Sequence, residues 1–113
     1  MIERRRHPRI EVSHPVLYFP DISPRPRVAT TVDLSMGGTK LVTPYGLISG
    51  EDLGISIAIY PQVIRCRGTV VHVFRSPNER LTAGVRFEEM STQDRTYLGD
   101  YISSIMEQEA LTP

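Results

Sequence analysis

Several residue types whose abundance marks whole classes of protein are scarce in this chain of 113 residues. Cys66 is the sole cysteine, which excludes an internal disulfide framework and an all-cysteine metal site within one chain; we expect it to be a small core residue. Tryptophan is absent, and twelve of the thirteen basic residues are arginine, Lys40 being the exception. The formal net charge is zero, so the chain lacks the overall field that draws proteins to DNA or to anionic lipid.

Long hydrophobic runs are absent as well. The chain opens with Met-Ile-Glu-Arg-Arg-Arg, which is unlike a signal peptide, and no later run approaches the length of a membrane span. We therefore expect a cytoplasmic protein that does not insert into membranes. With 40% apolar and 23% charged residues, residues 1–113 have the composition and length of a single globular domain.

Sequence patterns of enzymes and metal sites are also missing. The three histidines, His7, His14 and His72, occupy different segments without metal-ligand spacing, and His72 is expected to have a structural role in a strand. There is no nucleophile elbow, carboxylate pair, Walker loop or dinucleotide-binding fingerprint. These absences favour a binding protein over an enzyme, with no metal and no cofactor.

Short segments of alternating apolar and polar residues, separated by turn residues, predict an all-β domain over residues 11–88. The clearest segment places Leu53, Ile55, Ile57 and Ile59 on one face. Five further strands are predicted at 16–19, 28–32, 39–43, 63–74 and 81–87, the last with Leu81, Ala83, Val85 and Phe87 inward. Six short strands are typical of a small sandwich or barrel, and the periodicity does not distinguish between the two.

Near the C-terminus the spacing of apolar residues changes from every second residue to the spacing of a helix. We therefore expect a helix over residues 91–110. Ser91 is predicted to be its N-cap, with Asp94 at the partner position of a capping box. Apolar residues recur at helical spacing and form one stripe, which comprises Tyr97, Leu98, Tyr101, Ile102, Ile105 and Met106. We expect this stripe to pack on the sheet or to cap an open barrel end; a stripe that binds a partner is the alternative.

Two motifs carry the chemistry. The first is an arginine pair, Arg4 and Arg5, followed by three spacers and Arg9. A guanidinium can bind a phosphate with two hydrogen bonds, reach O6 and N7 of guanine, or stack on a purine face. The second motif is Asp33-x-Ser35-x-x-Gly38, in which a carboxylate can accept both N1–H and N2–H of guanine, a hydroxyl can donate, and glycine allows close approach of the backbone.

In this order, the two motifs resemble those of the PilZ family, whose members bind cyclic di-GMP. The resemblance extends over about residues 3–107. It implies a small antiparallel six-stranded β-barrel followed by a C-terminal α-helix, with the arginine motif on a flexible N-terminal arm at residues 1–10. It also implies cyclic di-GMP-binding roles for six residues: Arg4, Arg5, Arg9, Asp33, Ser35 and Gly38.

The resemblance further implies how such a domain works. The expected function is that of a receptor that binds cyclic di-GMP and signals to a downstream protein partner. Because Arg5 and Arg9 repel one another until phosphates neutralise them, we expect the arm to close over the nucleotide only when it is bound. Family members with an arginine just before the two arginines that three residues separate tend to hold two intercalated nucleotides. In this chain the separated arginines are Arg5 and Arg9, and Arg4 directly precedes them.

Alternatives to these interpretations stay open. Residues 33–38 could form only a tight turn whose side chains bond to backbone amides, and the basic terminus could be only a solvated chain end. An adaptor of the same fold that binds protein and no nucleotide is the second functional candidate. A barrel that binds RNA or single-stranded DNA ranks third, because the chain has no tryptophan and no net positive charge. The predicted strand aromatics Tyr18, Phe19, Phe74 and Phe87 are accordingly expected in the core.

Overall fold

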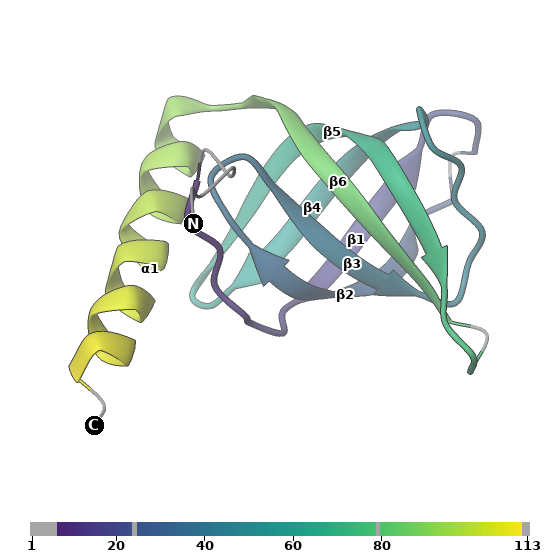
Figure 1. Ribbon diagram of the computed structural model, residues 1–113. Coiled ribbons are helices and arrows are strands. Elements are labelled where there is room, and N and C mark those ends of the chain that lie inside the picture. Colours follow the sequence, from purple (N-terminus) through teal and green to yellow (C-terminus); the bar gives the residue numbers. More distant parts are fainter. Residues whose placement is uncertain (1–6, 24, 79, 112–113) are drawn as a thin grey trace.

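The computed structural model describes residues 7–23, 25–78 and 80–111 (Figure 1). Within these ranges the chain forms six strands and one helix, and each overlaps its predicted range. The elements are β1 (Pro15–Pro20), β2 (Arg27–Leu34), β3 (Gly38–Thr43), β4 (Asp52–Ile59), β5 (Gln62–Arg75), β6 (Leu81–Met90) and α1 (Thr92–Leu111).

The strands form a closed antiparallel barrel in the order β1-β2-β3-β6-β5-β4, and β4 pairs back onto β1. The alternating pattern was compatible with a sandwich or a barrel. The structure is a barrel, as the resemblance implied. Because the sheet is closed, each strand has a partner on both sides and no long edge is exposed to pair with another chain.

Alternation of side chains along the strands fills the barrel interior. On β4, Leu53, Ile55, Ile57 and Ile59 are all buried, as predicted. Tyr18 of β1 is fully buried, and its hydroxyl lies 2.9 Å from Oγ1 of Thr43, which satisfies the phenol within an apolar core.

Two of the aromatic residues expected in the core lie outside it. Phe19 is 39% exposed and Phe74 is 59% exposed, so the prediction for both was wrong. Phe19 follows the buried Tyr18 directly, and neighbouring residues of a strand face opposite sides of the sheet. Phe74 lies beyond a register shift between Val70 and His72 in β5, which reverses the faces that the alternating pattern suggested. Phe87 is half-buried and packs against the core.

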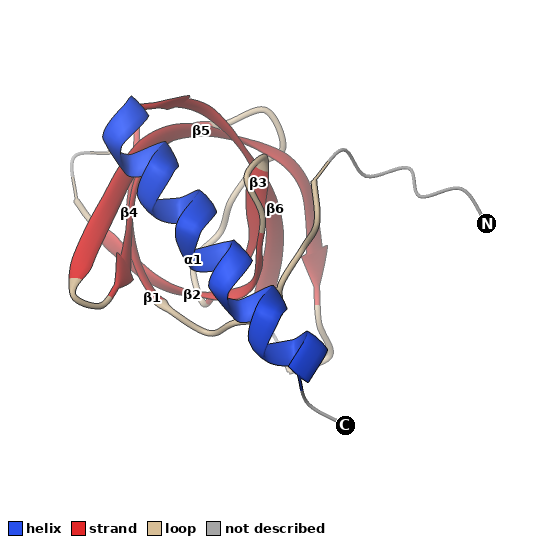
Figure 2. Cartoon of the chain, turned by 90° about the vertical axis from the view of Figure 1, so that its left-hand side faces the viewer, coloured by secondary structure: helices blue, strands red, loops and turns tan. Residues whose placement is uncertain are grey.

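Helix α1 closes one end of the barrel (Figure 2). Leu98 and Ile102 of its apolar stripe are buried, and the hydroxyl of Tyr97 donates to the carbonyl oxygen of Ile59 at 2.7 Å. Met106 departs from the predicted stripe because it is 40% exposed. The stripe therefore caps the barrel as far as Ile105, which is partly buried against the core.

The start of α1 follows the predicted cap only in part. Ser91 Oγ accepts the backbone N–H of Asp94 at 3.1 Å, which confirms Ser91 as the N-cap. The carboxylate of Asp94 accepts the backbone N–H of Arg65 at 3.0 Å instead of completing a capping box. The helix is thus attached to β5 at its first turn.

Burial of Leu98 generates a prediction about stability. Substitution Leu98→Ala should lower the free energy of unfolding by about 2–5 kcal/mol, because it opens a cavity beneath the helix. Met106→Ala removes a side chain of similar size from an exposed position of the same helix and should lower it by less than about 1 kcal/mol. Denaturant unfolding measures both values; equal losses would contradict the placement of the helix.

Candidate functional site

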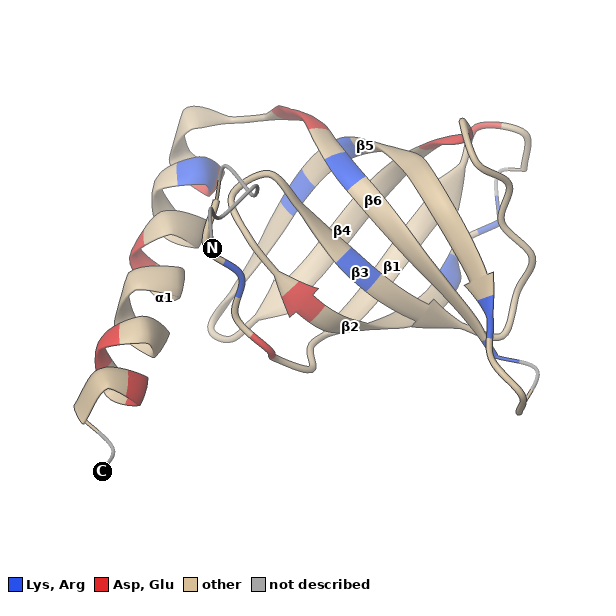
Figure 3. Cartoon of the chain, viewed as in Figure 1, with Lys and Arg blue, Asp and Glu red and all other residues tan. Residues whose placement is uncertain are grey.

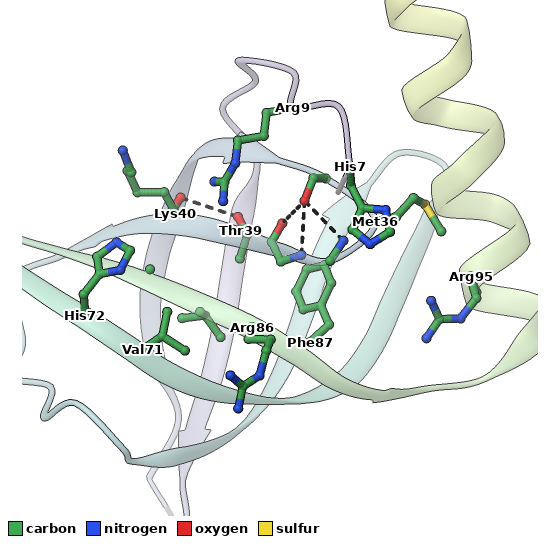
Figure 4. Close-up of a pocket in the computed structure, with 15 residues that line it drawn as sticks. His7, Arg9, Met36, Thr39, Lys40, Val71, His72, Arg86, Phe87 and Arg95 are labelled. Carbon is green, nitrogen blue, oxygen red and sulfur yellow. Dashed lines mark hydrogen bonds between the residues drawn. The ribbon is translucent and has the colours of Figure 1, made fainter. Parts of the chain in front are cut away.

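A cleft of about 610 Å³ lies on the outer face of the barrel, over β3 and β6 (Figure 4). The segment that precedes β1 contributes His7 and Arg9 to it, and the first turns of α1 contribute Arg95. Its remaining lining comes from the turn at residues 35–37 and from β3, β5 and β6. Three parts of the fold that are distant in sequence therefore meet at one surface.

The cleft is basic although the whole chain is neutral. Arg9, Lys40, Arg86 and Arg95 line it, and no carboxylate is among its described lining residues. Figure 3, in which lysine and arginine are blue, shows basic residues on β3, on β6, at the start of α1 and in the segment before β1. Concentrated positive charge in a concave surface attracts anions even where the net charge is zero.

The two predicted motifs meet beside this cleft. Ile10 and Leu34 exchange two backbone hydrogen bonds of 2.9 Å, which fix the segment before β1 to the end of β2. The neighbouring residues then form an ion pair, with Arg9 Nη1 3.0 Å from Asp33 Oδ1. The same carboxylate oxygen accepts the backbone N–H of Lys40 at 3.1 Å. Residues 24 positions apart in sequence are thus brought into contact, as a joint site requires.

A register shift in β2 places Asp33 at this position. The pairing of β2 with β3 shifts between Thr31 and Asp33, so that Asp33 faces Lys40 and Leu34 faces Thr39. Asp33 and Leu34 are consecutive, yet both are buried. An extra residue in one strand changes the direction of the side chains that follow, which allows a carboxylate to point toward the N-terminal segment.

Ser35 supports the turn between β2 and β3 from within. Its hydroxyl accepts the backbone N–H groups of Gly37 and Gly38 and donates to the carbonyl oxygen of Gly38, each at 3.2 Å. The side chain is almost fully buried, at 3% exposure. The tight turn that was the local alternative for residues 33–38 is therefore present.

Packing against β6 requires glycine at position 38, which the sequence did not reveal. A Cβ atom at this position would lie 2.2 Å from the carbonyl oxygen of Val85 in β6. The obstacle is backbone and not a flexible side chain, so any larger residue requires the barrel to shift. Gly37 differs, because a Cβ there would meet the ring of His7.

Two predicted site residues, Arg4 and Arg5, lie outside the described residues. Lys40, Arg86 and Arg95 were not predicted from the sequence as site residues. His72, for which a structural role was expected, is exposed and lines the cleft. No local motif contains these residues, since strand pairing and helix placement bring them together. Period-two alternation does place Lys40 and Arg86 on the outer face, which was the one available signal.

Other candidate chemistry has little support. Cys66 is half-buried against the core, and burial raises the pKa of its thiol to about 12, so its reactive thiolate is scarce at neutral pH. The described residues include no cluster of three or more histidine, cysteine, aspartate or glutamate side chains suited to a metal ion. None of the described helical residues forms a segment long and apolar enough to span a membrane.

Comparison with solved structures identifies similar folds. The Bacillus subtilis inhibitor of motility (MotI/DgrA) has a TM-score of 0.83 at 22% identity, over 99% of this chain and 55% of that one. The PilZ domain of Escherichia coli YcgR, solved with cyclic di-GMP, has a TM-score of 0.75 at 19% identity, over 96% of this chain and 95% of that one. The K. pneumonia MrkH complex with cyclic di-GMP has a TM-score of 0.75 at 17% identity, over 97% of this chain and 55% of that one.

At these identities the likenesses establish the fold alone, and the chain spans about half the length of MotI and MrkH. No curated protein matches this chain in sequence. The family model described as PilZ domain matches residues 3–104, which is nearly the whole length. This match confirms the resemblance that the two motifs suggested, and the chain belongs to the PilZ domain family.

Proposed function

We propose that this chain is a cyclic di-GMP receptor domain that holds the nucleotide in the basic cleft and signals to a partner protein. The observation that carries the proposal is the contact between Arg9 and Asp33, which unites the two motifs at the edge of the cleft. Relatives of the same fold support the proposal, since the YcgR PilZ domain and MrkH were both solved with this nucleotide.

The chemistry of the cleft suits such a ligand. A cyclic dinucleotide carries two fixed phosphate charges and two guanine bases, and arginine can serve either group. Arg9 is partly exposed, with 34% of its side chain accessible, so its guanidinium can reach a ligand without first leaving a buried position. Four described cationic side chains line one concave surface, and such a concentration of positive charge attracts the two phosphates of the nucleotide.

Asp33 and Arg9 suggest an exchange of partners on binding. In the structure the guanidinium of Arg9 and the carboxylate of Asp33 form an ion pair with each other. We infer that Arg9 turns to a phosphate or to a guanine acceptor edge, and that Asp33 accepts N1–H and N2–H of the same guanine. The carboxylate keeps its hydrogen bond from the backbone of Lys40 throughout, so its charge is never unpaired.

Arg4 and Arg5 belong to the proposed arm, which closes over the nucleotide. Arg9 is already paired with Asp33, but closure also brings the charge of Arg5 close to Arg9 and to the other cations of the cleft, so the closed arrangement requires the phosphates of the ligand to neutralise these charges. A partner that prefers one arrangement of the arm then responds to the level of nucleotide, as linkage demands.

The adaptor alternative is favoured by one specific observation. The polar side chains of the second motif are satisfied within the chain, Asp33 by Arg9 and Lys40, and Ser35 by its own turn. A protein that uses this surface for structure alone needs no ligand there. Direct binding measurements distinguish the two functions.

Calorimetric titration provides the first test. Cyclic di-GMP should bind saturably to the wild-type protein, whereas Arg9→Ala should weaken binding by about 10- to 100-fold, the value of one charge-assisted hydrogen bond. Arg75→Ala removes an exposed arginine at the end of β5 and should leave affinity unchanged. Cyclic di-AMP should not bind, because adenine leaves Asp33 without its donors. Absence of wild-type binding would favour the adaptor, provided that thermal unfolding shows a folded protein.

Limited proteolysis tests closure of the arm. Trypsin cleaves after arginine, and residues 4–6 and Arg9 offer several sites. Saturating cyclic di-GMP should slow cleavage at these sites several-fold, whereas the same concentration of cyclic di-AMP should not. Equal cleavage rates with and without bound nucleotide would exclude the switch while leaving the binding site intact.

Stoichiometry tests the role of Arg4. If its place before the spaced pair supports a second nucleotide, the wild-type protein should bind two nucleotides per chain and Arg4→Leu should bind one. A count of one that Arg4→Leu does not change would refute this role. Calorimetry or equilibrium dialysis with a known active protein concentration provides the count.

A further inference from the structure

We propose that the outer face of β3, β6 and β5 carries a second subsite of the cleft, in which Lys40 binds a phosphate and the ring of His72 supports a purine base. This inference rests on the proposed function, and it assigns part of the recognition to residues outside both motifs. It follows from strand register, from a glycine, and from the ammonium group of Lys40, which has no partner among the described residues.

Strand pairing places the two residues in one row across the sheet. Lys40 of β3 lies opposite Gly84 of β6, and Gly84 also lies opposite His72 of β5. Neighbouring strands are about 4.8 Å apart, so the backbones of Lys40 and His72 are separated by roughly twice that distance. Gly84, which has no side chain, lies between them. Figure 4 shows both side chains at the same end of the cleft.

Gly84 determines where the imidazole lies. A Cβ atom at residue 84 would be 2.3 Å from Nε2 and 2.4 Å from Cε1 of His72, so the ring lies directly over the backbone of β6. Phe74 flanks the ring, with centroids 5.1 Å apart. The ring is thus held in place on the sheet while His72 as a whole stays exposed, which leaves a flat surface for a base.

The backbone of Lys40 is held by a hydrogen bond, whereas its ammonium group extends from the sheet beside the cleft. Its backbone N–H donates to Asp33 Oδ1, the oxygen that also pairs with Arg9, so one carboxylate fixes two cationic residues relative to each other. Within the described part of the chain, its ammonium group has no ion pair or hydrogen bond. Arg86 differs, because its guanidinium already pairs with Glu88 at 2.9 Å.

The shape of the ligand explains why two cationic positions are useful. A cyclic dinucleotide has its two phosphates on separate sides of one ring, and a single arginine cannot neutralise both. Arg9 and Lys40 lie on different elements beside the same cleft, each with a group that can meet one phosphate. A base that extends beyond Lys40 along the row reaches His72.

Three substitutions test the subsite. Lys40→Gln should weaken cyclic di-GMP binding about tenfold. His72→Ala should weaken it by about 5- to 150-fold, the range for loss of one base-stacking contact, whereas His72→Phe should bind within a few-fold of wild type because it keeps a flat ring over Gly84. Arg75→Ala is the matched control. If His72 only covers Gly84, then His72→Ala will lower thermal stability without changing affinity, and the proposal fails.

The single lysine permits an independent readout. Reductive methylation followed by peptide mapping reports on Lys40 as the only side-chain amine. Saturating cyclic di-GMP should slow its modification several-fold, and cyclic di-AMP should not. If the wild-type protein binds cyclic di-GMP but Lys40 reacts at an unchanged rate and Lys40→Gln binds normally, the second subsite is wrong and the receptor function stands. If the wild-type protein binds no nucleotide, the receptor function itself is wrong.

Discussion

The carboxylate of Asp33 is the group on which the arrangement of the candidate site depends. One of its oxygens accepts hydrogen bonds from Arg9 and from the backbone of Lys40, and so joins the N-terminal segment to β3. A charged oxygen that is mostly shielded from solvent needs such partners, because an unpaired buried carboxylate is strongly unfavourable. The position of Asp33 comes in turn from the register shift in β2.

The cleft borders the parts of the fold through which binding can be communicated. Its walls belong to the segment before β1, to the sheet and to the first turns of α1. Met36, in the turn that Ser35 supports, lies against the helix, where a Cβ at Gly99 would be 3.7 Å from its sulfur. The hydroxyl of Tyr101 lies 2.6 Å from Nε2 of His14, which connects the same helix to the chain just before β1. Both the turn at residues 35–37 and the segment before β1 therefore contact α1.

Much of this organisation is predictable from the sequence because it is local. Period-two alternation located all six strands, the change to helical period located α1, and Ser91 marked its first turn. The spaced arginines and the Asp33 motif indicated a shared site, and Arg9 and Asp33 are indeed in contact. What alternation could not reveal is the effect of register shifts, which placed Phe74 outside the core.

The non-local part of the site was also out of reach. Lys40, His72 and Arg86 converge only because β3, β6 and β5 are neighbours in a barrel whose strand order the sequence does not state. Gly38 was interpreted as room for a ligand, and the sequence could not reveal the second requirement for glycine that packing against β6 imposes. The roles of Arg4 and Arg5 remain predictions, since both lie outside the described residues.

An NMR titration of the isotope-labelled protein with cyclic di-GMP shows directly whether the nucleotide binds in this cleft. The backbone amide of Lys40 reports on Asp33, and the amides of Gly37 and Gly38 report on the turn that Ser35 supports. If the nucleotide binds in the cleft, these signals and those of Arg9 and His72 should shift saturably, while signals at the far end of the barrel, such as Tyr45, should stay unchanged. Shifts confined to another face, or no shifts at saturating nucleotide, would contradict it.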